Sequence, residues 1–219
     1  METAQQIVIL AAGGFPTHPV PLRALREAHF VVCCDSAYSQ FLAFNASLSI
    51  PFIVIGDGDS LSADSQRQLG DRWLQVDEQD YNDLHKAMTW AAGRFPIHNA
   101  QFTILGATGR REDHTLGNIS YLVTFAEEYP GADITMLTDH GSLCAVRGSR
   151  TFASFPRQQI SIFAMNPAVP IYGHGLKWPL DAFHARRWWQ ATLNETLGSE
   201  FSLSSEDWLV LFRTYEPKD

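Results

Sequence analysis

The first half of the chain alternates short, continuous apolar runs with segments of helical periodicity, and this alternation constrains the fold more than any other feature. Continuous apolar runs are typical of strands that are buried on both faces of a parallel sheet. We expect such strands over 7–10, 30–33, 52–55 and 102–105. Helices are predicted over 21–28, 37–45, 63–69, 82–95 and 113–127. Together they predict an α/β domain with a mainly parallel sheet.

The pattern changes after Tyr129-Pro130-Gly131, which breaks the last predicted helix. The apolar runs that follow are short, separated by turns and poor in helical periodicity. They predict strands over 134–137, 143–146, 159–163, 169–172, 200–203 and 208–212. The sequence therefore indicates an α/β domain over 1–130 and an all-β domain over 131–219, built as an antiparallel sandwich or barrel.

Charge and composition narrow the classes of function. A formal net charge of −8 argues against nucleic acid or an anionic membrane as the main partner. No apolar run approaches the ~20 residues of a membrane span, and the polar start, Met1–Gln6, is unlike a signal peptide. The three cysteines, an odd number, favour a reduced compartment. We expect a cytoplasmic protein without a structural zinc site.

Polar or glycine-rich loops follow three of the predicted strands. They are Asp35-Ser36, Gly56–Ser60 and Gly106–His114. Ligands of open parallel sheets bind at the carboxyl ends of the strands. Because these loops share that edge of the sheet, they predict a single ligand-binding cleft.

The loop Gly56–Ser60 carries Asp57 and Asp59 on a turn with two glycines. Two carboxylates so placed can face a hard divalent cation such as Mg²⁺, which needs only one or two of them. A structural explanation is equally open at this point, in which Asp59 or Ser60 caps the next helix.

Asp80, Asp83 and Lys86 lie at helical spacing, so they share one face of the predicted helix. The structural alternative is that Asp80 caps this helix and Asp83 is its capping-box partner. Together with Asp57 and Asp59, however, these acids would repel one another at one cleft unless a cation lies among them.

The segment Gly106–His114 resembles a phosphate-binding loop that leads into a helix, although it lacks the Walker A pattern. Arg110 and Arg111 can supply the cations for phosphate oxygens. The alternative is a simple turn, with Asp113 as a helix cap and His114 as an ordinary residue of the first helical turn.

Taken in order along the chain, these segments resemble the thiamine pyrophosphokinase family. The matching residues are Cys34-Asp35-Ser36-Ala37, Gly56–Ser60, Asp80-x-x-Asp83-Leu84-x-Lys86-Ala87, Gly106-x-x-Gly109-x-Arg111-x-Asp113-His114-x-Leu116-x-Asn118, Gly175–Leu180 and Thr192–Glu195. The resemblance covers nearly the whole chain. It implies an α/β domain followed by a β-sandwich, a homodimer, and transfer of pyrophosphate from ATP to thiamine to give thiamine diphosphate and AMP.

The resemblance also implies roles for particular residues. Mg²⁺ and the triphosphate would be held by Asp57, Asp59, Asp80 and Asp83, with Lys86, Arg111 and Asp113 on the phosphate side. The ATP site would comprise Asp35, Ser36, Gly106, Thr108, Gly109, Arg111 and His114. Thiamine would stack on Trp178 and contact Thr192 and Asn194, in a pocket completed across the dimer interface.

This chain departs from the family pattern at Ser36, Arg110 and Leu193. The N-terminal motifs would serve a pyrophosphokinase of a pterin alcohol equally well. A non-catalytic sensor of thiamine or nucleotide and a metal-dependent phosphohydrolase are further alternatives.

Overall fold

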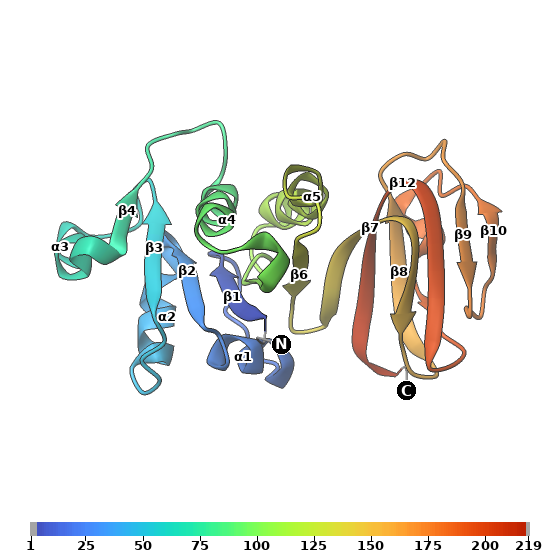
Figure 1. The fold of residues 1–219 in the computed structure, drawn as a ribbon, viewed down its shortest axis with the longest axis horizontal. Coiled ribbons are helices and arrows are strands. Elements are labelled where there is room, and N and C mark those ends of the chain that lie inside the picture. Colours follow the sequence, from blue (N-terminus) through green and yellow to red (C-terminus); the bar gives the residue numbers. More distant parts are fainter. Residues whose placement is uncertain (1–3, 218–219) are drawn as a thin grey trace. The chain divides into compact units, whose positions relative to one another are not determined.

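The structure, a computed structural model, describes residues 4–217, and the chain divides into two compact units between Asp139 and His140. The N-terminal unit is built on a parallel sheet with the strand order β6-β5-β1-β2-β3-β4 (Figure 1). Its strands are β1 Gln5–Leu10, β2 Phe30–Cys34, β3 Phe52–Gly56, β4 Trp73–Gln75, β5 Ala100–Leu105 and β6 Asp133–Leu137. Its helices are α1 Pro19–Arg26, α2 Tyr38–Asn45, α3 Ala63–Leu69, α4 Asp83–Arg94 and α5 Glu112–Glu128, with short 3₁₀ turns at Asp35–Ala37, Gly70–Arg72 and Ile97–Asn99.

Helices cover both faces of this sheet, which explains the continuous apolar runs of its strands. Side chains alternate along a strand, so Val8 and Leu10 of β1 pack with Leu25 of α1 and Phe41 of α2. On the other face, α4 lies against β1, β2 and β3, and α5 lies against β6. Figure 1 shows α1 and α2 on the opposite side of the strands from α4 and α5.

The predicted helices and the first four strands are confirmed within three residues at each end. The short strand β4 was not predicted, because Trp73–Gln75 is too brief to show a pattern. The strand over 134–137 was assigned to the second domain, but β6 pairs in parallel with β5 and belongs to the first. Tyr129-Pro130-Gly131 ends α5 and returns the chain to the sheet, so the division falls after Asp139 and not after residue 130.

The C-terminal unit is strand-rich and antiparallel, as predicted. Its elements are β7 Gly141–Ala153, β8 Gln158–Ala164, β9 Ile171–His174, β10 Leu180–Phe183, a 3₁₀ turn at Trp188–Ala191, β11 Asn194–Glu195 and β12 Glu200–Pro217. The two strands predicted over 200–203 and 208–212 form the single strand β12, which has a register shift between Ser205 and Leu209. Its first part pairs with β9 and its second part with β8, while β7 pairs with both.

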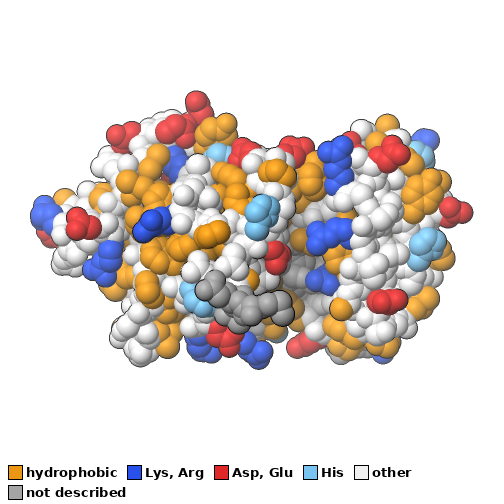
Figure 2. Space-filling model, in the orientation of Figure 1, with side chains coloured by type: hydrophobic (Ala, Val, Ile, Leu, Met, Phe, Trp, Pro, Cys, Tyr) orange, Lys and Arg blue, Asp and Glu red, His pale blue; other side chains and the backbone are white. Residues whose placement is uncertain are grey.

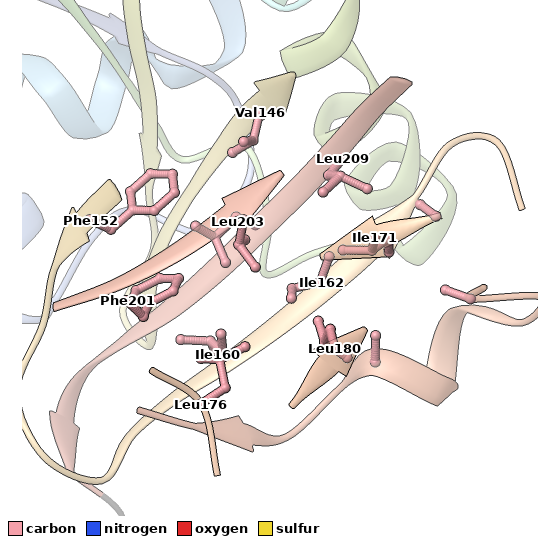
Figure 3. Packing of buried hydrophobic residues seen from close by; sticks show 14 residues of the cluster. Val146, Phe152, Ile160, Ile162, Ile171, Leu176, Leu180, Phe201, Leu203 and Leu209 are labelled. Atoms are coloured by element: carbon pink, nitrogen blue, oxygen red, sulfur yellow. The ribbon is translucent and has the colours of Figure 1, made fainter. Parts of the chain in front are cut away.

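The two parts of β12 and their partners enclose the core of this unit. Figure 3 shows Phe201 and Leu203 of β12 pointing toward Ile160 and Ile162 of β8. The stacked rings of Phe152 and Phe201, 5.2 Å between centroids, close one end. Among the described residues, no helix is long and apolar enough to cross a membrane.

Candidate active site

A cavity of about 320 Å³ lies where the strand order of the parallel sheet reverses, between β1 and β5. Loops leaving the carboxyl ends of neighbouring strands diverge at such a point and leave a crevice. The cavity is lined by Ala11, Ala12, Gly13, Cys34, Ser36, Asn82, Asp83, Leu84, Ala107, Thr108, Arg110, Arg111, His114, Thr115 and Asn118. The loops predicted after β2 and β5 thus do share one cleft.

The loop after β1, residues 11–14, forms one wall of the cavity, although it is not among the loops predicted from the sequence. The N–H groups of Gly13 and Gly14 donate to the carbonyls of Gly106 and Thr108, each at 2.6 Å. A Cβ on Gly13 would lie 2.4 Å from both carbonyl oxygens, so only glycine permits this contact. The signal was present as Ala11-Ala12-Gly13-Gly14 directly after a buried strand.

Asn82 and Asn118 connect two of the loops that line the cavity. The side-chain amide of Asn118 donates to the Ala107 carbonyl at 2.8 Å and accepts from the amide of Asn82 at 3.0 Å. The side-chain oxygen of Asn82 accepts the His85 N–H and so caps α4. The alternative in which Asp80 caps this helix is therefore wrong.

Asp35 is buried directly beneath the cavity, with 2% of its surface exposed. Its Oδ1 accepts the N–H of Ser36, but its Oδ2 has no hydrogen-bond partner among the described residues. Gly56 packs on this side chain so closely that a Cβ there would lie 2.6 Å from the Asp35 carboxyl carbon. A buried carboxylate oxygen without a partner is costly, so Asp35 indicates a cation or donor bound from outside the chain.

Asp83 interacts with the charges of Asp35 and Asp57, and its pKa is raised. Burial, followed by the negative charges of Asp35 and Asp57, raises the pKa of Asp83 to about 6, although Lys86 opposes the shift. The Lys86 ammonium is buried, lies 3.6 Å from an Asp83 oxygen and donates to the Val76 carbonyl at 3.2 Å. The positive charge of Lys86 therefore does not offset the burial of Asp83 and the negative charges of Asp35 and Asp57 that act on it.

Of the four acids of the predicted metal set, Asp83 lines the cavity. Asp57 is half-buried, Asp59 and Asp80 are exposed, and these three are not among the lining residues. Figure 2 shows acidic side chains gathered at the upper edge of the N-terminal unit, where the exposed segment 77–80 carries Asp77, Glu78 and Asp80. The N–H of Asp59 donates to Asp57 Oδ1 at 3.1 Å. Ser62, and not Asp59 or Ser60, caps α3, so that structural alternative is also wrong.

The donor chemistry at this edge fits Mg²⁺. Within residues 4–217, no three His, Cys, Asp or Glu side chains lie close enough to hold one metal ion. Magnesium is usually bound through one or two carboxylates, several waters and substrate phosphates. Asp57 and Asp83, whose charges interact, are of the residue type that such a site needs. A cage of four carboxylates stays a prediction.

Arg111 and Asp113 form an exposed bidentate ion pair at the start of α5, with contacts of 3.1 and 2.6 Å. The hydrogen bonds from Arg111, then the His114 N–H, lower the pKa of Asp113 to about 2. Asp113 does not cap α5, because Arg111 is the N-cap residue. Arg110, by contrast, makes no ion pair within residues 4–217 and lines the cavity. Its side chain is a free cation at the mouth of the cavity.

A second cavity, of about 330 Å³, lies in the C-terminal unit. It is lined by Trp178, Pro179, Leu180, Phe183, Gln190, Ala191, Thr192, Leu193 and Asn194. The buried amide of Asn194 closes on the backbone of Trp178, accepting its N–H at 3.2 Å and donating to its carbonyl at 2.8 Å. Asn194 thereby positions Trp178, whose ring is 51% exposed.

Two further contacts shape this second cavity. The Lys177 ammonium lies 4.7 Å from the Trp178 ring centroid and 3.2 Å from both carboxylate oxygens of Glu195. The Thr192 hydroxyl donates to the Trp189 carbonyl at 2.7 Å. Leu193 has a φ of 59°, which is strained for a leucine, and exposes its side chain at the rim.

Comparison with family models gives a match in each unit. Residues 22–136 match the model described as "Thiamin pyrophosphokinase, catalytic domain". Residues 141–212 match "Thiamin pyrophosphokinase, substrate-binding domain". The first match contains the lining residues of the sheet-edge cavity from Cys34 onward, while Ala11–Gly13 lie before it. The second match contains the whole lining of the tryptophan cavity.

Individual relatives agree with the family models. Thiamin pyrophosphokinase 1 of Caenorhabditis elegans is 27% identical over 46% of this chain and 42% of its own length. Thiamine pyrophosphokinase 1 of Oryza sativa is 28% identical over 60% of this chain and 53% of its own length. The chain thus spans about half the length of these curated relatives.

Solved structures share the fold at low sequence identity. A thiamin pyrophosphokinase from Candida albicans superposes with a TM-score of 0.76 at 19% identity, covering 97% of this chain and 90% of that one. One from Bacillus subtilis gives 0.75 at 23% identity, covering 95% and 98%. Both neighbours therefore cover both units.

The contact between Gly56 and Asp35 yields a first prediction. Gly56→Ala should lower the free energy of unfolding by about 1–3 kcal/mol, because the new methyl group must displace the buried Asp35 carboxylate. Gly117→Ala, in open space within α5, is the matched control and should raise it by about 0.5–1 kcal/mol. Urea denaturation measures both, and equal effects of the two substitutions would contradict the packing described.

The raised pKa of Asp83 yields a second prediction. The ordinary value is 3.8 and the folded value is about 6, so between these pH values the folded chain holds a proton that the unfolded chain has lost. Stability contributed by this group is therefore lost as the pH rises through that window. Relative to Asp83→Asn, the wild type should lose about 1–2 kcal/mol between about pH 4 and pH 7, after allowance for partial exposure. Denaturation in EDTA measures this difference, and parallel pH profiles would refute it.

Proposed function

The chain belongs to the thiamin pyrophosphokinase family, and we propose that it transfers the pyrophosphoryl group of ATP to the hydroxyl of thiamine, giving thiamine diphosphate and AMP. The observation that carries the proposal is the cavity at the β1–β5 switch point. It brings a glycine-rich loop, the guanidinium of Arg110, unpaired among the described residues, and an excess of buried carboxylate charge together at one sheet edge.

We propose that the triphosphate lies along the loop Gly106–Arg111 and the start of α5. The predicted ATP residues Ser36, Thr108, Arg111 and His114 line the cavity, while Asp35 lies beneath it. Gly106 and Gly109 hold the loop open with φ values of 64° and 86°. A helix N-terminus favours bound phosphate, and arginine binds it through two parallel hydrogen bonds.

Asp57 and Asp83 are the residues that would hold Mg²⁺, with Asp59 and Asp80 as further predicted contacts. When bound, the ion would neutralise the phosphate oxygens during transfer. Lys86 holds Asp83 and the Val76 carbonyl in place from below. Phosphoryl-type transfer needs little covalent help, so positioning by these residues supplies most of the rate.

The thiamine hydroxyl must lose a proton as it attacks the β-phosphorus. Asp113, which the family resemblance places on the phosphate side, is a poor base because its pKa is lowered to about 2 by Arg111. We therefore assign the proton to Asp80, and the role of Asp113 to orienting Arg111. Asp80 lies in the exposed segment that leads into α4.

Thiamine is proposed to stack on the half-exposed ring of Trp178 in the second cavity, with Thr192 at its rim. A flat, cationic ring system gains both stacking and cation–π attraction on tryptophan. Asn194 serves this pocket by fixing the Trp178 backbone.

We also propose that the protein is a cytoplasmic homodimer. Large apolar side chains close in sequence to the second cavity are exposed, with Trp188 at 55% and Trp189 at 72%. Contact with a second copy would bury them. Sedimentation of the purified chain tests this, and a monomer at all concentrations would contradict it.

One assay separates the function from its alternatives. The pure protein is incubated with ATP and Mg²⁺, and with thiamine or a pterin alcohol, before AMP and the product mass are measured. Thiamine diphosphate with equimolar AMP supports the proposal. A pterin diphosphate, phosphate released without an acceptor, or binding without turnover would favour the pterin enzyme, the phosphohydrolase or the sensor.

Loss of the metal-binding acids yields a third prediction. Asp57→Asn and Asp80→Asn should each lower kcat about a hundredfold or more, as removal of a key electrostatic group commonly does. Asp71→Asn, an exposed acid of the Gly70–Arg72 turn, is the control and should keep wild-type turnover. Near-normal kcat of both variants at saturating Mg²⁺ would remove the metal assignment.

The tryptophan cavity yields a fourth prediction. Trp178→Ala should raise KM for thiamine about tenfold while KM for ATP stays within about twofold, because only the stacking surface is lost. The KM of Trp178→Phe for thiamine should lie between those of Trp178→Ala and the wild type. An equal rise in both KM values would argue against thiamine binding there.

A further inference from the structure

An aromatic and ionic cluster lies between α4 and α5, outside the cavity already described. His85 of α4 is 8% exposed, and its Nε2 lies 3.1 and 3.2 Å from the two carboxylate oxygens of Glu128. The ring of Tyr81 stacks on the imidazole, 4.0 Å between centroids and 13° from parallel. The ring centroids of Tyr121 and Phe125 lie 5.5 and 5.7 Å from the centroid of the same imidazole.

The two helices provide these groups through their periodicity. Tyr121, Phe125 and Glu128 follow at spacings of about four and three residues, so they share one face of α5. His85 lies in the first turn of α4, directly after the segment Asp80–Asn82. The imidazole is therefore fixed by α5 and presents a rigid, flat surface to that segment.

The segment that carries Asp80 has few other restraints. Within residues 4–217, the stack on His85 is the only interaction that holds the Tyr81 ring, which is 47% exposed. Asn82, one residue on, is already tied to Asn118 and α4. Asp80, one residue before, is exposed and hydrogen-bonds through its N–H to the nearby Glu78 side chain. Tyr81, which directly follows Asp80 in the chain, is thus the residue nearest to Asp80 that is packed against a helix.

We propose that Tyr81, held by His85 and Glu128, is a positioning residue that fixes Asp80 for its role at the metal and the phosphates. The inference rests on the proposed function, since Asp80 acts there. The proposed group consists of Tyr81, His85 and Glu128. Tyr81 and His85 are close in sequence to the predicted acids, whereas Glu128 is the last residue of α5.

The test compares Tyr81→Ala with Tyr81→Phe, which keeps the ring. Tyr81→Ala should lower kcat and weaken binding of Mg·ATP about tenfold, as loss of a residue that orients a metal ligand does. KM for thiamine should stay within about twofold. Tyr81→Phe should match the wild type in all three. Binding is measured by calorimetry without thiamine, so it does not depend on turnover.

A double-mutant cycle with Glu128→Ala tests the link through His85. If Glu128 fixes the imidazole, Tyr81→Ala should cost less in the Glu128→Ala background than in the wild type. Tyr172→Ala, a tyrosine of β9 with 41% exposure, is the matched control and should change none of these quantities. Should Tyr81→Ala not fold, Tyr81→Leu replaces it with the same expected losses.

Two results would overturn the inference: Mg·ATP binding and kcat of Tyr81→Ala within twofold of wild type, or equal impairment of Tyr81→Phe. Failure of the proposed function is separate, because it would appear as absence of thiamine diphosphate with the wild-type protein. In that case the calorimetric comparison of the Ala and Phe variants still decides the role of Tyr81.

Discussion

The chemistry of the N-terminal unit depends on a carboxylate that the fold buries without satisfying. Asp35 has one oxygen bound to the Ser36 N–H and the other without a partner among the described residues. Gly56 packs against it, and Asp83 and Asp57 lie near enough for their charges to interact. A chain selected for stability alone would place a small apolar residue at position 35, so the retained carboxylate indicates that a ligand completes the site.

The parallel sheet brings this charge to a place where a polyphosphate can reach it. Strand order reverses between β1 and β5, and the loops after these strands line the cavity at the carboxyl edge of the sheet. The same loops are joined by short backbone hydrogen bonds from Gly13 and Gly14, which keep the wall rigid. Asn118 and Asn82 extend that rigidity to the start of α4. Rigid walls around mobile phosphates are what catalysis by positioning requires.

Much of this could be predicted from the sequence, because buried parallel strands and amphipathic helices leave strong periodic patterns. The helix caps were harder to predict, because several polar residues near each helix start are equally suited to the N-cap position. Asp80, Asp59 and Asp113 were each plausible helix caps, yet Asn82, Ser62 and Arg111 occupy those positions. Asp59 and Asp80 consequently do not serve as caps, and Asp113 instead pairs with Arg111, which capping preferences alone do not reveal. The role of the loop 11–14 is not predictable from residue type, because its small, uncharged residues act through backbone groups. The pairing of β6 with β5 is not predictable either, because the residues of a strand do not specify which strand it pairs with.

The departure from the family pattern at Arg110 changes the charge of the sheet-edge cavity. Asp113 already engages Arg111 through both of its oxygens, which reduces the positive potential that Arg111 offers to a phosphate. Arg110, one of the positions at which this chain departs from the family pattern, lines the same cavity without an ion pair in the described chain. The extra arginine therefore restores a free cation beside the loop Gly106–Gly109. Because the positive φ angles of this loop fall at Gly106 and Gly109, an arginine at position 110 does not strain its backbone.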